Sequence, residues 1–391
     1  YDPASGAVED QIIKAFEAEH PDIEVQKIPI NTGAGKVWEK AAVMAAGGDA
    51  PDVVDVSLAV GLSARRSGLL LDLQPFIQAD NFDMSRFRPG WQLTTGPDSA
   101  WGGKVYGIPW GLGILNIFYN RDMFRAAGLA EPYKGWTTSE FLNAAKHLTR
   151  AGADGKIQVF GTHPPNVGYS PWMFVDGNSL VDEQTGKLDL KDPKFAASLE
   201  FIRDVNANYN VSSWGDFRGQ QVAMDYEWDS FVGKLLTGGT SFDWSVTWAP
   251  RGPDAAEPVS YGQGHVMGIM KDSKNPQAAW QFVKFYYSDA AQALLAQHFL
   301  YPMTMNGMRS VSRLVDFPAP LDKAAILKPY VDVGALRTLP WWIPGFTDAI
   351  NKDSGTFDQV IKSKLSVSQW IDQLQHDFTV DSAKYVEAAN P

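Results

Sequence analysis

The feature that most constrains the fold is an alternation of helix-period and strand-period segments, at a spacing of about 10 to 15 residues. Residues 8–20 place apolar side chains at helical spacing between charged ones, and Pro21 ends the predicted helix. Residues 23–30 alternate and predict a strand. A helix over 36–46 and a short, β-branched, parallel strand over 51–57 follow. This order predicts an α/β fold.

The same patterns continue along the rest of the chain. We expect two strands joined by a turn, over 104–109 and 113–119, and a mostly helical C-terminal third from Lys323. Further helices are predicted over 137–148, 195–209, 276–287 and 290–297. No single linker divides the chain, so a protein with several lobes would have to cross between them more than once.

Composition excludes several classes of protein. The 391 residues include no cysteine, which rules out disulfides, thiolate metal sites and a cysteine nucleophile. The net charge of −11 opposes binding to nucleic acid or to anionic lipid. The apolar runs, such as 69–71, are far shorter than the roughly 20 residues that span a bilayer. The first residues do not resemble an export signal, so we expect any such signal to have been removed.

Tryptophan is unusually frequent, with 14 residues in the chain. Most aromatic rings serve a core, and that is the alternative for each of them. Several tryptophans nevertheless lie in segments rich in glycine and proline, where flat rings would suit the apolar faces of sugars. These are Trp101, Trp110, Trp172, Trp248, Trp341 and Trp342.

Two glycine-rich segments fail as nucleotide-binding motifs. Residues 31–36 resemble the end of a phosphate-binding loop. That pattern requires a glycine at position 30 and a Ser or Thr at position 37, but the chain has Ile30 and Val37 there. Residues 262–268 place their third glycine one position late and lead into a strand-like run. The six histidines form no local metal-ligand pair, and there is no nucleophile-elbow motif. His265, among glycines, could face a ligand or form an ordinary loop hydrogen bond.

One tight cluster of acidic and aromatic residues stands out, at 225–229. In an extended segment Asp225, Glu227 and Asp229 share one face, and Tyr226 and Trp228 the other. Paired carboxylates beside aromatic rings are typical of glycoside hydrolases. Sugar-binding proteins also use carboxylates, because a carboxylate accepts hydrogen bonds from several hydroxyls. A solvated acidic turn is the third interpretation.

Eight segments, in order, resemble the extracellular solute-binding proteins of carbohydrate ABC transporters, the family-1 group that includes maltose-binding protein. The resemblance covers nearly the whole chain. The segments are FEAEHPDIEVQ (16–26), AAGGDAPDVVDV (45–56), GLLLDLQPFI (68–77), KVYGIPW with IFYNRDMFRAAGL (104–129), WTTSEFLNAAKHLT (136–149), PWMFVDGNSLVDEQTGKLDL (171–190), FRGQQVAMDYEW (217–228) and YGQGHVMGIMKDSKNPQAAWQFVKFYYSDAAQALL (261–295).

The resemblance implies a two-lobed periplasmic-binding-protein fold of the α/β class, with three hinge crossings. We expect an N-terminal lobe of residues 1–112 plus 264–312 and a C-terminal lobe of 113–263 plus 313–391, with the ligand cleft between them. The crossings are expected near 110–116, 259–266 and 311–320. Ligand binding would close the lobes, and a membrane permease would recognise the closed form.

By position, the resemblance also implies ligand-facing residues. They are Ser57, Trp110, Gly113, Tyr169, Trp172, Glu227, Trp228, Gly262, Gln263, Gly264, His265, Arg337, Trp341 and Trp342. Arg337 could meet an acidic ligand group or hydroxyls, with an ordinary surface salt bridge as the alternative. The family usually has a small residue before the tryptophan of the VAM motif, and here Tyr226 and Glu227 intervene.

We therefore expect a non-enzymatic, periplasmic or secreted protein that delivers a carbohydrate to the permease subunits of an ABC importer. Aromatic stacking and hydrogen bonds would hold the sugar. No cofactor, metal or nucleic acid is expected, and the protein should be a monomer. Two alternatives remain open: an anionic polyol or sugar derivative bound through Arg337 and His265, and a glycoside hydrolase.

Overall fold

The computed structural model describes residues 3–28, 30, 34–57, 60–87, 102–168, 170–182, 185–298 and 302–387. Contacts divide the chain into two compact units. Unit 1 comprises residues 1–113 and 263–316, and unit 2 comprises residues 114–262 and 317–391. The chain passes between the units three times. The first passage lies within strand β2 (Ile108–Asn120) and the second within β7 (Val259–Ile269).

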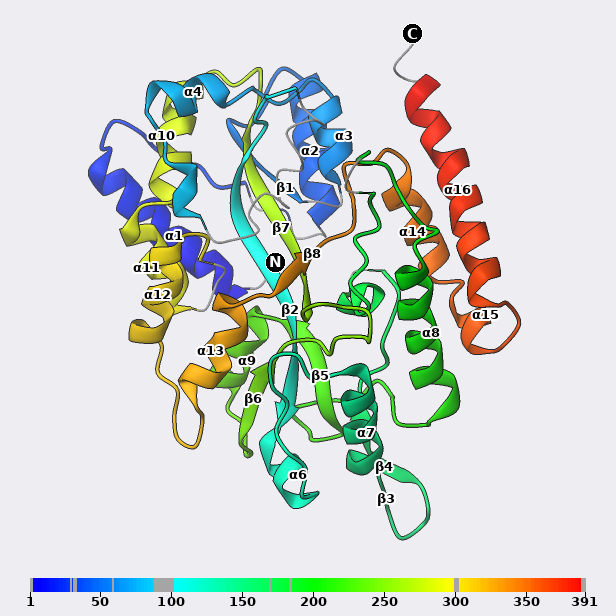
Figure 1. Cartoon of the computed structure of the whole chain (residues 1–391). Coiled ribbons are helices and arrows are strands. Elements are labelled where there is room, and N and C mark those ends of the chain that lie inside the picture. The colour runs from blue at the N-terminus through cyan, green and yellow to red at the C-terminus, as the bar shows by residue number, and fades with distance from the viewer. Residues whose placement is uncertain are drawn as a thin grey trace. The chain divides into compact units, whose positions relative to one another are not determined.

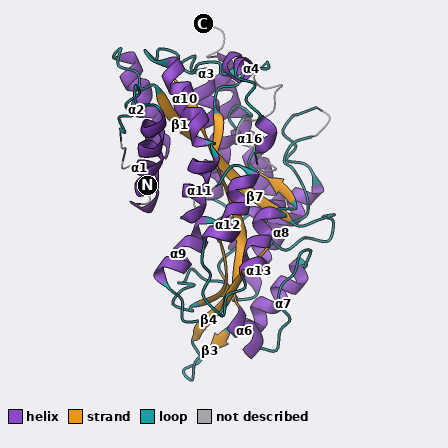
Figure 2. Ribbon diagram, turned by 90° about the vertical axis from the view of Figure 1, so that its left-hand side faces the viewer, coloured by secondary structure: helices purple, strands orange, loops and turns teal. Residues whose placement is uncertain are grey.

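Unit 1 pairs β1 (Val53–Ser57) with β7 in an antiparallel ladder that runs from Val53 opposite Ile269 to Ser57 opposite His265. In one apolar cluster Trp38 of α2 packs with Val56 and Val266 of these strands. Helix α11 lies alongside α12, and α1 packs against α10 and α11 (Figure 2). The helices of unit 1 are α1 (Pro3–Glu19), α2 (Ala34–Ala46), α3 (Gly61–Arg66), α4 (Gln74–Ala79), the 3-10 turn η2 (Met84–Arg86), α10 (Pro276–Tyr286), α11 (Asp289–Gln297) and α12 (Met305–Leu314).

Unit 2 is built on a sheet in which β5 (Val222–Trp228) lies between β2 and β4 (Ile157–Thr162). The β2–β5 pair is antiparallel and the β4–β5 pair is parallel. Three short strands pair with longer ones. β3 (Arg150–Ala151) pairs with β4, β6 (Trp244–Thr247) pairs with β2, and β8 (Ala335–Arg337) pairs with β7.

Helices of unit 2 pack around this sheet. Helix α16 packs against both α8 and α14 (Figure 1). Gly161 of β4 permits the close approach of α7, because a Cβ there would lie 2.0 Å from the carbonyl oxygen of Ala145. The helices are α6 (Arg121–Ala126), α7 (Thr138–Leu148), the 3-10 turn η4 (Pro171–Phe174), α8 (Pro193–Asn208), α9 (Ser230–Gly238), α13 (Lys323–Val331), α14 (Phe346–Ser354), α15 (Asp358–Ile361) and α16 (Val367–Glu387).

The helix predictions are confirmed, with ends that differ by a few residues. The capping signals that supported them are also present. Thr137 and Glu140 form a reciprocal capping box at the start of α7, and the Asp192 side chain caps α8. Ser288 caps α11 in the same way.

Three strand predictions were wrong in detail. The described residues of 23–30 form no strand, because the backbone N–H of Val25 donates to the Glu17 carboxylate at 2.9 Å instead of to another strand. β1 is antiparallel to its partner β7, which returns from more than 200 residues later in the chain. In place of the expected strands over 104–109 and 113–119 with a turn between them, there is one continuous strand, β2, from Ile108 to Asn120, and residues 104–107 form no strand.

Candidate functional site

Unit 2 gathers polar and aromatic side chains at one edge of its sheet. β4 and β5 are parallel, so their carboxyl ends lie at the same edge, where open α/β sheets bind ligands. His163 follows directly after β4, and Glu227 lies near the end of β5. A third segment runs beside β4, since Thr162 exchanges backbone hydrogen bonds with Val211 and Ser213 at 3.2 Å. That segment brings Trp214 to the same edge.

His163 is held between two hydrogen-bonding partners. Its Nδ1 forms an ion pair with Asp225, whose side chain is 4% exposed, and its Nε2 lies 2.6 Å from the carbonyl oxygen of Gly215. Burial alone would lower the pKa of His163. The hydrogen bond and charge of Asp225 outweigh burial, and the pKa of His163 is raised above its ordinary value of 6.5.

Glu227 is a half-buried carboxylate of β5. Within the described part of the chain it forms no ion pair, and its one hydrogen bond comes from the backbone N–H of Trp228 at 3.2 Å. Burial, and then the charge of Asp225, raise the pKa of Glu227. Asn116 lies directly opposite Glu227 in the β2–β5 ladder. The Asn116 side chain is fully buried, yet neither its Nδ2 nor its Oδ1 has a partner among the described residues.

The aromatic rings near this edge differ sharply in exposure. Trp172 is fully buried in the core of unit 2, with its ring centroid 5.7 Å from that of Tyr226. Trp228 is half-buried and meets Tyr261 edge-on at 6.1 Å. Trp214, which the sequence analysis did not single out, is 67% exposed and lies with its ring centroid 5.3 Å from that of His163.

Arg337 and the late tryptophan pair also belong to unit 2. Arg337 lies opposite Tyr261 in the parallel β7–β8 ladder and donates from Nε to the carbonyl oxygen of Asn178 at 3.2 Å. Among the described residues it forms no ion pair, so the surface salt bridge considered for it is not observed. Trp341 is buried at 3% exposure, and half-buried Trp342 meets it edge-on at 5.8 Å.

Unit 1 contains a second cluster, centred on Asp55 of β1. The indole Nε1 of Trp110 donates to Oδ1 of Asp55 at 2.8 Å, and the Nδ1 of His265 lies 3.0 Å from both carboxylate oxygens. The side chain of His265 is 32% exposed. Asp55 raises the pKa of His265 above 6.5, although burial alone would lower it. Ser57, opposite His265, is buried, and its Oγ lacks a partner among the described residues.

Sequence reasoning missed Asp55, His163, Trp214 and Asn116. For Asp55 a signal existed, because it lies in the same PDVVDVS segment as Ser57 and alternation places the two on one face. The other predicted positions are Gly113, Gly262, Gln263 and Gly264. They lie in β2 and β7 at the first two passages between the units, and all but Gln263 are buried. Tyr169 lies outside the described residues.

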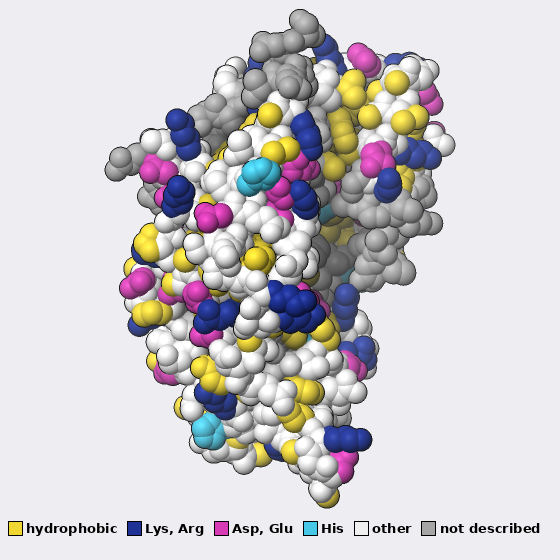
Figure 3. All heavy atoms as spheres, turned by 90° about the vertical axis from the view of Figure 1, so that its right-hand side faces the viewer, with side chains coloured by type: hydrophobic (Ala, Val, Ile, Leu, Met, Phe, Trp, Pro, Cys, Tyr) yellow, Lys and Arg dark blue, Asp and Glu magenta, His cyan; other side chains and the backbone are white. Residues whose placement is uncertain are grey.

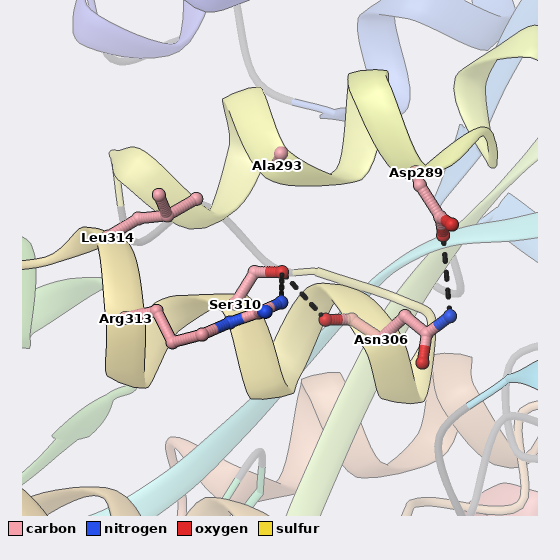
Figure 4. A pocket seen from close by; sticks show the side chains of 6 residues that line it. All are labelled: Asp289, Ala293, Asn306, Ser310, Arg313 and Leu314. Atoms are coloured by element: carbon pink, nitrogen blue, oxygen red, sulfur yellow. Dashed lines mark hydrogen bonds between the residues drawn. The ribbon is translucent and has the colours of Figure 1, made fainter.

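A surface groove of about 540 Å³ lies elsewhere in unit 1, between α11 and α12 (Figure 4). Its lining is mostly small or polar. Asn306 of α12 donates across it to Asp289 of α11 at 3.5 Å, and Arg313 donates to Ser310 within α12 at 3.2 Å. None of the predicted ligand residues lines this groove. We therefore treat the two clusters described above, one in each unit, as separate candidate sites.

The described residues contain no group of three or more His, Asp or Glu side chains arranged to hold a metal ion. None of the described helices is long and apolar enough to cross a membrane. On the face drawn in Figure 3, Lys and Arg side chains are interspersed with Asp and Glu. That pattern differs from the basic stripe of nucleic-acid-binding proteins.

The chain is similar to several known proteins in sequence and in structure. A putative binding protein of Brucella abortus is 22% identical over 310 residues, covering 76% of this chain and 72% of the relative. The sugar-binding protein MalE of Xanthomonas citri has a TM-score of 0.80 at 17% identity, with coverage of 98% and 97%. UgpB of Mycobacterium tuberculosis, solved with glycerophosphocholine, has a TM-score of 0.79 at 20% identity, with coverage of 98% and 96%.

These matches confirm the predicted α/β fold of the periplasmic-binding-protein type. Residues 2–293 match the sequence model of one family, described as bacterial extracellular solute-binding protein. That range covers most of the chain and confirms the resemblance found in the sequence. The chain therefore belongs to the bacterial extracellular solute-binding protein family.

Proposed function

We propose that this protein captures a carbohydrate and hands it, intact, to the permease of an ABC importer. The observation that carries the proposal is the pairing of Glu227 with Asn116. Among the described residues the Asn116 amide has no hydrogen-bond partner, and the Glu227 carboxylate accepts one hydrogen bond, from the backbone N–H of Trp228, whose ring is half-buried. A few convergent polar groups on an aromatic base are the usual composition of a small-molecule site. The structural relation to a sugar-binding protein of Xanthomonas citri supports the same ligand class.

The geometry argues against glycoside hydrolysis. That reaction needs two carboxyl groups that both reach the scissile bond. Asp225 and Glu227 share a face of β5, but Asp225 is almost fully buried and is engaged by His163. Glu227 would therefore act alone, as a hydrogen-bond acceptor for hydroxyls. This supports a binding role.

An anionic ligand is the second candidate, and one observation favours it. Arg337 is partly buried and has no carboxylate partner among the described residues. A guanidinium in this state can bind a phosphate. The structural relative solved with glycerophosphocholine suggests a phosphate ester of glycerol as the class of anionic ligand to test.

Further parts of the proposal come from the family. We propose that the protein acts outside the cytoplasmic membrane, as a monomer, and that both lobes close over the ligand. We propose that the protein binds its ligand without changing it chemically. These features need separate tests, such as sedimentation for the monomer and small-angle scattering with and without ligand for closure.

The first test of the ligand class is a thermal-shift screen. The panel contains maltotriose, mannotriose, arabinotriose and raffinose, with glucuronic acid and glycerol 3-phosphate as anionic members. A ligand that binds the folded state raises the melting temperature by mass action. Saturable shifts with neutral sugars support the proposal. Shifts with glycerol 3-phosphate alone support the second candidate, and no shift with any member contradicts both.

A further inference from the structure

Trp214 is the most exposed aromatic side chain among the described residues, at 67% exposure. Single exposed apolar residues are common on protein surfaces and need no explanation by themselves. Trp214 differs because its ring contacts the imidazole of His163, with the centroids 5.3 Å apart and the two planes inclined by 51°. An exposed indole that contacts a second ring, at the carboxyl edge of a sheet, is suited to stacking against a flat, partly apolar ring.

His163 contacts the residue after Trp214 in two ways. Its Nε2 lies 2.6 Å from the carbonyl oxygen of Gly215 and 3.2 Å from the backbone nitrogen of the same residue. A protonated Nε2 donates to the oxygen. A bare Nε2 can only accept, so it is attracted to the N–H and repelled by the oxygen. The protonation state of Nε2 therefore determines whether His163 bonds to the carbonyl oxygen or to the N–H of Gly215.

The other groups around His163 favour the protonated form. On β5, Asp225 pairs with Nδ1, and the charge of Glu227 also acts to raise the pKa of His163. Tyr226 of the same strand meets the imidazole edge-on at 6.5 Å. From the Trp214 segment, the charge of Asp216 acts on Asp225. Asp225 and Glu227 therefore favour the imidazolium, whereas Asp216 acts to raise the pKa of Asp225.

We propose that Trp214 is the stacking platform of a sugar subsite at the carboxyl edge of unit 2, and that the proton on His163 holds this platform in place. The inference rests on the proposed function, because it names a residue that binds the proposed ligand class. It adds that affinity depends on pH. Loss of the proton breaks the Nε2–H donation to Gly215, so the Trp214–Gly215 segment shifts and the platform is lost.

The test is a calorimetric titration of wild type and variants with the trisaccharides of the panel above, from about pH 5 to pH 9. We expect Trp214→Ala to raise the Kd at least about tenfold and Trp214→Phe to restore most of the affinity. The matched control is Tyr133→Ala, which removes another exposed aromatic ring of unit 2, bonded to Glu140. It should leave the Kd unchanged.

The pH profile tests the positioning role of His163. In wild type the Kd should rise as the pH passes upward through the raised pKa of His163. His163→Gln should remove this dependence, whereas His147→Gln should keep it, since His147 bonds only within α7, to the carbonyl oxygen of Asn143. A second measurement needs no ligand. The tryptophan fluorescence of Trp214→Phe is subtracted from that of wild type at each pH, and the difference should change with the same midpoint pH as the Kd of wild type.

The outcomes separate the two proposals. If wild type binds a sugar and Trp214→Ala binds it equally well, the platform is refuted while the proposed function stands. If Trp214→Ala loses affinity but the Kd of wild type and of His163→Gln show the same pH profile, the positioning role is refuted. If wild type binds no member of the panel, the proposed function fails, and the platform fails with it.

Discussion

Asn116 lies directly opposite Glu227 on neighbouring antiparallel strands, and the buried carboxamide of Asn116 has no hydrogen-bond partner among the described residues. A buried amide left unpaired costs free energy, so such groups usually bind a water molecule or a ligand. Here the amide lies beside a carboxylate that forms no ion pair within the described part of the chain. In the proposed function, ligand hydroxyl groups donate to Glu227 and exchange hydrogen bonds with Asn116.

Glu227→Gln should weaken sugar binding about tenfold to a hundredfold, because hydrogen bonds to a charged group contribute about 1.5–3 kcal/mol. Calorimetry on the tightest-binding panel member measures the change. Exposed Glu257 of the same unit is the matched control, and Glu257→Gln should bind as wild type does. Sugar cleavage by wild type that vanishes in Glu227→Gln, with affinity retained, would instead establish a glycosidase.

Asp55→Asn should lower the pKa of His265, because the Asp55 carboxylate is what raises it. In wild type the folded pKa of His265 lies above the unfolded value near 6.5. The stability from this pair is therefore fully present below about pH 6.5 and is lost as the pH rises through the folded pKa. NMR titration of the imidazole checks the shift. Asp52→Asn, which removes a carboxylate bonded to Ser273 instead, should leave the titration unchanged.

Salt dependence separates the two ligand classes at Arg337. A neutral sugar should bind with nearly the same Kd at about 0.01 M and 1 M salt, although the screening length falls from about 30 Å to 3 Å. Arg337→Ala should then weaken binding by about tenfold or less, through lost hydrogen bonds. A steep salt dependence that disappears in Arg337→Ala would show that the ligand is an anion.

Truncation of Trp172 and truncation of Trp214 should change the free energy of unfolding by very different amounts. Trp172→Ala removes a fully buried ring from the core of unit 2, and we expect it to lower the free energy of unfolding by about 3–5 kcal/mol. Trp214→Ala should change stability by less than about 0.5 kcal/mol, since its ring is mostly exposed. Chemical denaturation followed by circular dichroism compares them. Equal losses would mean that Trp214 is structural.

Local signals predicted the helices well. The Thr137–Glu140 capping box and the Asp192 cap depend on residues a few positions apart, so the sequence contains all the information needed. Strand partners depend on distant residues. β1 pairs with a segment more than 200 residues away, and Val25 is bonded by the side chain of Glu17, which alternation within 23–30 cannot reveal.

The candidate site was predictable only in part. Glu227 and His265 stood out through their neighbours in sequence, and both occupy polar clusters in the structure. Trp172 and Trp214 lie in segments of similar composition, yet one is fully buried and the other is 67% exposed. Their exposure is decided by Phe141 and Tyr226 around one ring and by His163 beneath the other. Those contacts exist only after folding.

The central claim is that the protein binds a carbohydrate and leaves it unchanged. The most direct measurement is a calorimetric titration of wild type with the four neutral trisaccharides, followed by mass spectrometry of the recovered ligand. The account predicts saturable binding of at least one trisaccharide, recovered whole after prolonged incubation. Failure to bind any of them, or recovery of shorter sugars, would contradict it.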